Sequence, residues 1–189
     1  MRKKPLVLLD VDGILADFIG SVLTIIKKET GIEFYENNIK TFEMFEDLKT
    51  SKYNIKNICY KHFKKPKYAL KLKLLDGSVE AVERIKELAD IHIVTTPMHM
   101  NPTWTFEREQ WLKKYFNIDY KDITFTSKKY LLKGDVLIDD NEFNVRSWSK
   151  ENPNSKAFLW SKSYNEHIND LEKVSNWKPI IEYIEKINK

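Results

Sequence analysis

The sequence predicts an α/β fold in which helices flank a parallel β-sheet. Short apolar runs of strand length alternate with segments that carry apolar residues at helical spacing. This alternation is typical of parallel sheets joined by right-handed crossovers. The block at residues 16–75 lacks it, which indicates a helical insertion after the first strand. A chain of 189 residues fits one compact domain with such an insertion.

Four apolar runs are predicted to be strands buried on both faces. Each run is short and continuous, as expected of a strand covered by helices on both sides. The four runs are residues 6–9, 91–94, 123–125 and 136–138, and residues 157–160 are a fifth candidate.

Three later segments are predicted to be helices from their apolar spacing. Residues 79–89 repeat apolar side chains at helical intervals, and Ser78 before them is a natural N-cap. The next helix is expected to open at Asn101 and Pro102, with asparagine as the N-cap and proline at the first helical position. A last pattern, residues 177–187, predicts a C-terminal helix.

The insertion is predicted to be a small helical cap over the carboxyl end of the sheet, where open α/β proteins bind ligands. Gly31 is expected to end a helix and Pro66 to interrupt one, so the block is predicted to contain short helices and irregular chain. The predicted division is residues 1–15 and 76–189 for the core, with residues 16–75 for the cap.

Composition limits the partners and the location. Lys and Arg number 32 against 28 Asp and Glu, and the net charge of +4 is too balanced to require nucleic acid or a membrane surface. The single cysteine, Cys59, excludes an internal disulfide framework and suits a reducing compartment. The first apolar run ends at Asp10, short of the ~7–15 residues of a signal-peptide core. A cytoplasmic protein is therefore expected, and its oligomeric state stays open, a homodimer included.

Two predicted strands end in paired aspartates. Asp10 and Asp12 follow the first run, and Asp139 and Asp140 close the fourth. Either pair alone is more often a turn at a strand end. Both pairs together would gather four carboxylates at one edge of the sheet, where they need a cation, and oxygen ligands suit Mg²⁺.

Hydroxyl and cationic side chains follow the other strands. Thr95 and Thr96 offer hydroxyl and N–H groups suited to an anionic oxygen. Lys128 and Lys129 follow the third run, although loop lysines are usually solvated. Arg108 lies in a stripe of large apolar residues, where its guanidinium needs an anion, and a structural ion pair is an equal alternative. Together with the aspartates, these groups suit phosphoryl transfer through an aspartyl-phosphate.

The motifs "DVDGILADF", "TTP" and "GDVLIDD", in this order, resemble those of the haloacid-dehalogenase-like (HAD) phosphatases. Within them, the chain looks most similar to the 5′(3′)-deoxyribonucleotidase family, with the poorest match in the cap. The resemblance implies a HAD-like Rossmannoid core with a small helical cap. It also implies a Mg²⁺-dependent phosphatase that dephosphorylates (deoxy)ribonucleoside monophosphates through an aspartyl-phosphate.

The resemblance further implies roles for individual residues. Asp10 would be the nucleophile and a Mg²⁺ ligand. Asp12 would be the general acid and then the general base, with its backbone carbonyl also reaching the metal. Lys129 matches the phosphate-binding lysine better than Lys128 does. The other phosphate-binding candidates are Thr95, Thr96 and Arg108.

Metal and base-binding residues are also implied by the resemblance. Asp140 matches the acidic metal motif with Asp139 as its support, although which of the two is the direct ligand stays open. Phe18 would stack on the nucleobase. Further pocket candidates from the cap are Phe42, Met44 and Phe45.

Three alternatives remain at this stage. One is a HAD phosphatase that acts on another phosphorylated metabolite, and a second is one that acts on a nucleic-acid 3′ phosphate. The lysine-rich run at residues 61–73 could hold a strand, but only Phe63 and Tyr68 offer rings for stacking, so a solvated cap face is favoured. The third is a non-catalytic nucleotide-binding protein. The presence of Asp12 argues against it, because a protein that only binds a nucleotide does not need a general acid. Base, sugar and 5′ or 3′ phosphate stay open.

Overall fold

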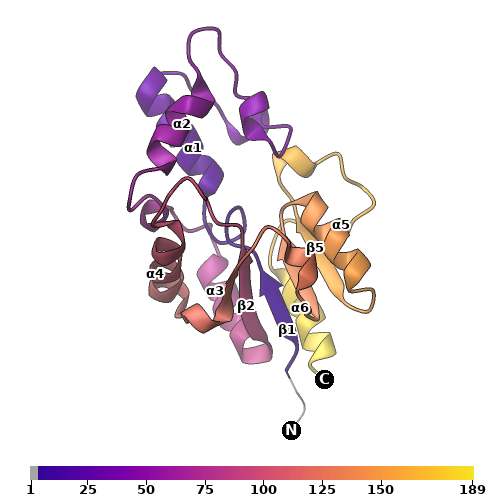
Figure 1. Cartoon of the computed structure of the whole chain (residues 1–189). Helices are drawn as coiled ribbons and strands as arrows, with labels where there is room; N and C mark the ends of the chain where they lie inside the picture. The colour runs from indigo at the N-terminus through magenta and orange to yellow at the C-terminus, as the bar shows by residue number, and fades with distance from the viewer. Residues whose placement is uncertain (1–3) are drawn as a thin grey trace.

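The core of the protein is a parallel sheet of six strands, seen in a computed structural model that describes residues 4–189 (Figure 1). The strand order is β3-β2-β1-β4-β5-β6, and every pairing is parallel. Helices flank the sheet, so the predicted α/β fold class is confirmed. The strands are β1 (Leu6–Leu9), β2 (Asp90–Thr95), β3 (Ile123–Phe125), β4 (Val136–Asp139), β5 (Lys156–Trp160) and β6 (Lys173–Val174).

The five predicted strands are all present, and their bounds differ from the prediction by at most one residue at either end. The short strand β6 was not predicted, because two residues carry too little pattern to be seen in a sequence. The expectation of burial on both faces is wrong for β3, whose side chains are only half-buried. The reason is that β3 lies at the edge of the sheet and pairs on one side only.

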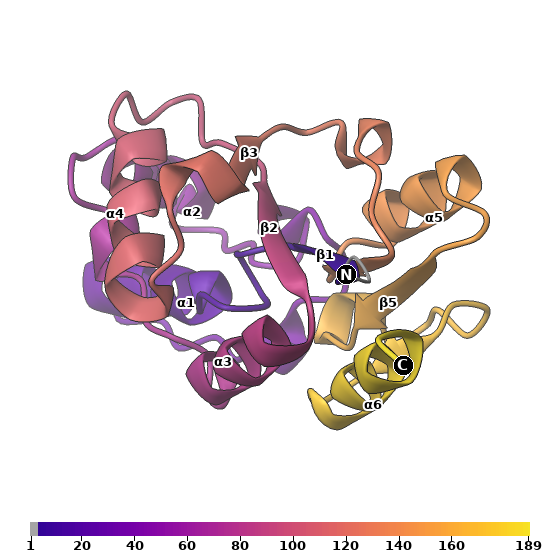
Figure 2. The same cartoon turned by 90° about the horizontal axis from the view of Figure 1, so that it is seen from below.

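Helices cover both faces of the sheet (Figure 2). α3 (Ser78–Leu88), α4 (Trp104–Phe116) and α6 (Lys178–Ile187) pack on the main core, and α5 (Glu142–Glu151) packs on the other face. Alternate residues of β1 divide between the two: Val7 and Leu9 join the main core, and Leu8 joins the cluster under α5. Among the helices of residues 4–189, none combines the length and apolar character that a bilayer crossing requires.

Two predicted helix starts are corrected by the structure. Ser78 is the first residue of α3 and not its N-cap, because Gly77 takes that position with a left-handed backbone (φ 73°). α4 begins at Trp104 and not at Pro102. Asn101 does not cap it directly; its side-chain oxygen accepts hydrogen bonds from the N–H (3.0 Å) and hydroxyl (2.9 Å) of Thr103, which forms a turn before the helix.

The segment between β1 and α3 is helical and irregular, as expected. α1 (Phe18–Thr30) ends at Gly31, the predicted stop, which adopts a left-handed conformation (φ 73°). α2 (Ile55–Phe63) packs against α1, and Figure 1 shows both helices beyond the carboxyl end of the sheet. The short 3-10 helices of this segment are η1 (Glu36–Asn38), η2 (Met44–Glu46) and η3 (Ala69–Lys71).

The two ends of this segment are joined to each other. The N–H of Asp17 donates to the carbonyl of Lys73, and the N–H of Leu75 donates to the carbonyl of Leu15, both at 2.8 Å. These crossed bonds hold the outgoing and returning chains side by side. The division into a core and a cap of residues 16–75 stays a prediction.

Three further 3-10 helices complete the chain; one precedes β3, and the other two follow β3 and β5 at the carboxyl edge. They are η4 (Tyr120–Asp122), η5 (Lys129–Leu131) and η6 (Ser163–Asn165). η5 packs against α5, and η6 packs against η1 from the inserted segment. The loops after β3 and β5 are thereby fixed next to the ends of β1 and β4.

The packing of α5 on the sheet predicts a large loss of stability for Trp148→Ala. Trp148 is fully buried against Leu8 and Leu137, and its indole N–H donates to the carbonyl of Leu132 at 2.9 Å. Its removal should lower the free energy of unfolding by about 3–5 kcal/mol. Urea unfolding followed by circular dichroism measures this loss. Phe106→Ala is the matched control on an exposed ring (63% exposed), with an expected change within about 0.5 kcal/mol. Equal losses would contradict the packing described.

Candidate active site

The carboxyl ends of β1, β2 and β4 form one edge of the sheet beneath α1 and α2 (Figure 1). The chain runs from β1 to β2 on one side and returns to β4 on the other, so β1 lies at the point where the strand order reverses. Open α/β sheets bind ligands at such a point. A cavity of about 440 Å³ opens here, a size typical of small-molecule sites.

Asp10 and Lys129 form the buried centre of this site. The Asp10 carboxylate lies 2.8 Å from Nζ of Lys129, which also donates to Asp139 at 2.7 Å. Lys129 is only 1% exposed and starts η5, whereas Lys128 beside it is exposed. Lys129, which the family resemblance favoured, therefore lies between the two aspartates, and Lys128 does not.

The charges at this centre shift one another's proton affinity. Burial raises the pKa of Asp10 to about 7, with Lys129 opposing the rise and Asp139 adding to it. Burial acts to lower the pKa of Lys129, but the carboxylates of Asp10 and Asp139 outweigh it and raise that pKa. Lys129 is therefore held as an ammonium, which partly offsets the negative charge around it.

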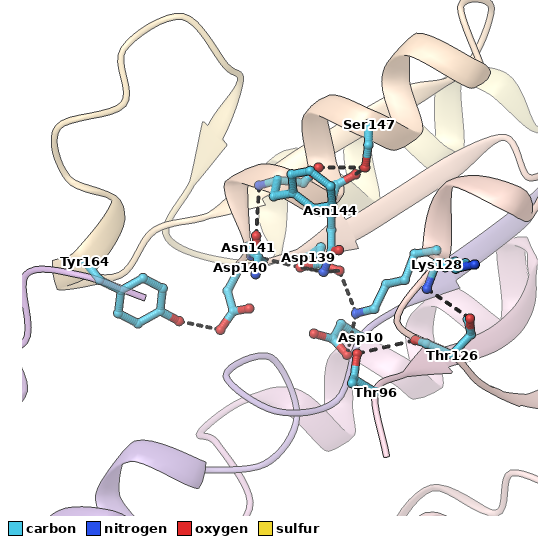
Figure 3. Close-up of polar contacts among 12 residues, drawn as sticks. Asp10, Thr96, Thr126, Lys128, Asp139, Asp140, Asn141, Asn144, Ser147 and Tyr164 are labelled. Carbon is cyan, nitrogen blue, oxygen red and sulfur yellow. Dashed lines mark hydrogen bonds and ion pairs between the residues drawn. The ribbon is translucent and has the colours of Figure 1, made fainter. Parts of the chain in front are cut away.

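Asp139 and Asp140 have different surroundings (Figure 3). Asp139 is saturated by donors: besides Lys129, it accepts from the N–H of Asn141 (2.8 Å) and from the side-chain amide of Asn144 (3.1 Å). Among the described residues, the carboxylate of Asp140 accepts a hydrogen bond from the hydroxyl of Tyr164 alone. The lone pairs of Asp140 are therefore freer than those of Asp139 to take another ligand.

A divalent cation fits among these carboxylates. Asp10, Asp139 and Asp140 are buried, and one oxygen of each lies within 4.8 Å of the others. Burial, together with the charges of Asp10 and Asp139, raises the pKa of Asp140 well above its ordinary value. The positive charge of Lys129 alone thus does not balance the negative charge of the three carboxylates. An oxygen-only donor set with excess negative charge suits Mg²⁺.

Gly13 provides the room for Asp140. Its φ of +83° lies in the left-handed region, and a Cβ there would fall 1.9 Å from Oδ2 of Asp140. Both the backbone conformation and the close approach therefore require glycine. This explains the glycine in the "DVDG" motif.

Asp12 is separated from the three clustered carboxylates by its pairing with Arg108. Nη2 of Arg108 donates to both carboxylate oxygens of Asp12, at 2.6 and 2.9 Å. Arg108 is fully buried, as its place in the apolar stripe predicted, and the anion it meets is Asp12. The arginine does not line the cavity, whereas Asp12 does.

The two threonines at the end of β2 differ in exposure. Thr95 is buried at the edge of the cavity, beside Asp10 and Lys129 in its lining. Thr96 is exposed, and its hydroxyl donates to the carbonyl of Thr126 at 3.3 Å (Figure 3). Both line the cavity, so both can meet a ligand there.

The opposite wall of the cavity is apolar. Three of the four pocket candidates from the sequence, Phe18, Phe42 and Met44, line it. Phe45 does not line it; its ring packs instead against Tyr60 (5.7 Å) and Phe63 (6.4 Å). Because Phe45 directly follows Met44 in a 3-10 turn, the two side chains point in different directions, so only one can face the cavity.

Several lining and supporting residues were not predicted from the sequence. Trp104 and Met98 add to the apolar wall. Tyr164 binds Asp140, and the side-chain amide of Asn165 donates to the backbone carbonyl of Asp140 at 3.0 Å. Tyr164 and Asn165 belong to η6, beyond every motif read from the sequence. The side-chain amide of Asn144 supports Asp139. Among these residues, only Asn144 lies close enough to a predicted aspartate along the chain to have been suggested by the sequence.

Solved structures with this fold are HAD-like hydrolases. A haloacid dehalogenase-like hydrolase of Streptococcus pneumoniae aligns with a TM-score of 0.59 at 16% identity, covering 97% of this chain and 99% of that one. A HAD-type protein of Bacillus subtilis, solved with bound magnesium, aligns with a TM-score of 0.56 at 12% identity and the same coverage. At these identities the likeness confirms the HAD-like fold.

Sequence comparison identifies the family more closely. The 5′(3′)-deoxyribonucleotidase of Bacillus subtilis is 24% identical over 178 residues, covering 94% of this chain and 96% of that protein. The family profile described as 5′ nucleotidase, deoxy (Pyrimidine), cytosolic type C protein matches residues 4–188. The match spans the described chain almost from end to end, and the predicted resemblance is confirmed. The chain therefore belongs to this 5′-nucleotidase family, a family of phosphoric monoester hydrolases with the HAD-like fold.

Proposed function

We propose that the protein is a Mg²⁺-dependent phosphatase of deoxyribonucleoside and ribonucleoside monophosphates that works through an aspartyl-phosphate on Asp10. The observation that carries this proposal is a single cavity with two unlike walls. Asp10, Thr95, Lys129 and Asp140 form a charged wall, and Phe18, Phe42 and Met44 form an apolar one. A nucleotide has the same two parts, a phosphate and a nucleobase.

In the first step, an oxygen of Asp10 attacks phosphorus and the bond from phosphorus to the leaving sugar oxygen breaks. Asp12 transfers its proton to that oxygen, which leaves as the nucleoside hydroxyl, and Asp10 carries the phosphoryl group. Lys129 lies at Asp10 and supplies positive charge to the phosphoryl oxygens as charge develops there. Thr95 also lines the cavity, and its hydroxyl is a neutral donor for the same oxygens.

In the second step, water attacks the phosphoryl group on Asp10. Asp12, now a carboxylate, takes a proton from that water as the new bond to phosphorus forms. The bond between phosphorus and the Asp10 oxygen then breaks, so inorganic phosphate leaves and the Asp10 carboxylate is restored. One residue serves both steps, because the first step removes the proton that the second step returns.

Mg²⁺ would be held by Asp10 and Asp140, with Asp139 as support and the backbone carbonyl of Asp12 as a further ligand. When bound, it would neutralise the phosphate beside the carboxylates and so allow one anion to approach another. Asp139 suits the supporting role because its oxygens already accept from Lys129, Asn141 and Asn144. Asp140 suits direct binding because, within residues 4–189, its carboxylate accepts a hydrogen bond from Tyr164 alone.

The alternative substrates receive less support from the geometry. A nucleic-acid 3′ phosphate would need stacking rings beside the lysine-rich run, but Phe63 and Tyr68 are both buried in the apolar core. A small phosphorylated metabolite would leave the wall of Phe18, Phe42 and Met44 without a partner. A nucleoside monophosphate can contact both walls, the charged one with its phosphate and the apolar one with its nucleobase.

The first prediction concerns the nucleophile. Asp10→Asn should abolish release of inorganic phosphate from a deoxynucleoside monophosphate, because the amide is isosteric but cannot attack phosphorus. Phosphate release is measured at saturating Mg²⁺, since the change also removes a metal ligand. The melting temperature serves as the control for folding. A variant that folds and keeps more than a small fraction of the wild-type rate would show that Asp10 is not the nucleophile.

The second prediction concerns the metal. Exhaustive chelation should stop turnover, and Mg²⁺ should restore it. Mg²⁺ should also raise the melting temperature of the wild type, by a stabilisation of about 2.7 kcal/mol at 100 times its dissociation constant. Asp140→Asn should need much more Mg²⁺ for both effects. The matched control is Asp170→Asn, an exposed carboxylate paired with Arg146. Full activity after chelation would rule out the metal requirement.

The third prediction tests whether the substrate carries a nucleobase. If Phe18 stacks on the base, the contact is worth ~1–3 kcal/mol. Phe18→Ala should then lower kcat/KM for a deoxynucleoside monophosphate by about 5- to 150-fold. The same variant should hydrolyse a small aryl phosphate nearly as well as the wild type. Phe18 also packs on Phe63 at 5.4 Å, so equal losses on both substrates with a lower melting temperature would assign it to the packing of the inserted segment.

A further inference from the structure

We infer that Arg108 is a positioning residue that holds the Asp12 carboxylate toward the leaving oxygen, and that it does not itself bind the phosphate. The inference rests on the proposed function, in which Asp12 gives and takes the proton. It replaces the role that the family resemblance implied for Arg108. Three observations support it: what Arg108 contacts, what fixes its guanidinium, and where its remaining nitrogens lie.

The contact places Asp12 between Arg108 and the substrate space. Nη2 of Arg108 donates to Oδ1 of Asp12 at 2.6 Å and to Oδ2 at 2.9 Å. The Asp12 side chain is 28% exposed and lines the cavity, whereas the Arg108 side chain is fully buried and does not line it. A ligand in the cavity therefore meets the carboxylate first.

The guanidinium is fixed in place by aromatic rings. It lies 4.8 Å from the ring centroid of Trp104 and 5.6 Å from that of Trp111, within the range of cation–π attraction. Trp111 is itself anchored, because its indole N–H donates to the carbonyl of Leu72 at 2.9 Å. A charge held this firmly can fix the direction of the carboxylate that it contacts.

The remaining donors of Arg108 do not face the cavity. Nε and Nη1 are buried from solvent and have no hydrogen-bond partner within residues 4–189. An arginine that binds phosphate presents its fork of donors to the anion. In Arg108, Nη2 donates to Asp12, and Nε and Nη1 are buried without a partner in residues 4–189. The geometry of Arg108 thus fits a residue that acts through Asp12.

A purely structural role for the buried charge of Arg108 is the competing explanation, and the neighbouring residue is an example of a buried charge with such a role. Glu107 is buried one position earlier on α4 and accepts hydrogen bonds from the backbone N–H groups of Lys67 and Ala69. It ties α4 to the returning end of the inserted segment and makes no contact with Asp12. Glu107→Gln is therefore a matched control that disturbs a buried charge on the same helix without touching the acid.

The leaving group separates a positioning role from a structural one. A nucleoside leaves as an alkoxide that needs a proton, so its departure depends on a well-placed acid. A 4-nitrophenolate leaves readily without one. kcat/KM reports the steps up to departure of the leaving group and is therefore measured for thymidine 5′-monophosphate and for 4-nitrophenyl phosphate.

Arg108→Met should lower kcat/KM for thymidine 5′-monophosphate by about 10- to 100-fold, part of the range that general acids contribute. The value for 4-nitrophenyl phosphate should change by less than about 3-fold, as should the inhibition constant of inorganic phosphate, since the phosphate site is intact. Arg108→Lys should show a smaller selective loss, because an ammonium can make one of the two contacts. If Arg108→Met fails to fold, Arg108→Lys tests the same inference. Glu107→Gln should lower the melting temperature without changing the ratio between the two substrates.

Equal losses on both substrates, or weaker inhibition by inorganic phosphate, in an Arg108 variant would overturn this inference alone. The first result would assign Arg108 to structure and the second to phosphate binding. A wild type that hydrolyses neither substrate would instead overturn the proposed function, and the inference with it. The two failures are thus distinguishable by the activity of the unchanged protein.

Discussion

The buried ammonium of Lys129 is the interaction on which the rest of the site depends. It bridges Asp10 from β1 and Asp139 from β4, at 2.8 and 2.7 Å. Removing charges from water costs several kcal/mol for each ion, and only close pairing with further hydrogen bonds offsets that cost. The pairing is possible because β1 and β4 are neighbours and end at the same level. The adjacency of two strands thereby fixes Asp10, the ammonium of Lys129 and Asp139 together.

α4 connects this charged centre to the inserted segment through two consecutive residues. Glu107 accepts from the backbone of the chain that returns from the insertion, and Arg108 holds Asp12 beside the cavity. Consecutive residues on a helix lie about 100° apart, so the two side chains serve different neighbours from one rigid element. The position of Asp12 and the packing of the inserted segment above it therefore depend on the same helix. A shift of α4 would disturb both.

The sequence predicted the charged wall of the site well and the apolar wall less completely. Asp10, Asp139 and Asp140 follow apolar strand runs, and parallel strands bring their ends together, so their meeting could be derived from pattern alone. Lys129 could be preferred to Lys128 only through family resemblance. Tyr164 and the Arg108–Asp12 contact depend on how distant segments pack, which periodicity does not record. Phe45 was misplaced because a short 3-10 turn has too few residues to show which side chain faces inward.

The two walls of the cavity also differ in what holds them. The carboxylates of the charged wall lie at the ends of central strands, which are rigid because they are paired on both sides. Phe42 and Met44 lie in or beside short turns of the inserted segment, and Phe42 is half exposed. The walls meet at Tyr164, whose hydroxyl binds Asp140 and whose ring lies 5.7 Å from that of Phe42. Because one tyrosine contacts both, the position of the Phe42 ring at the apolar wall and the orientation of the Asp140 carboxylate are physically linked.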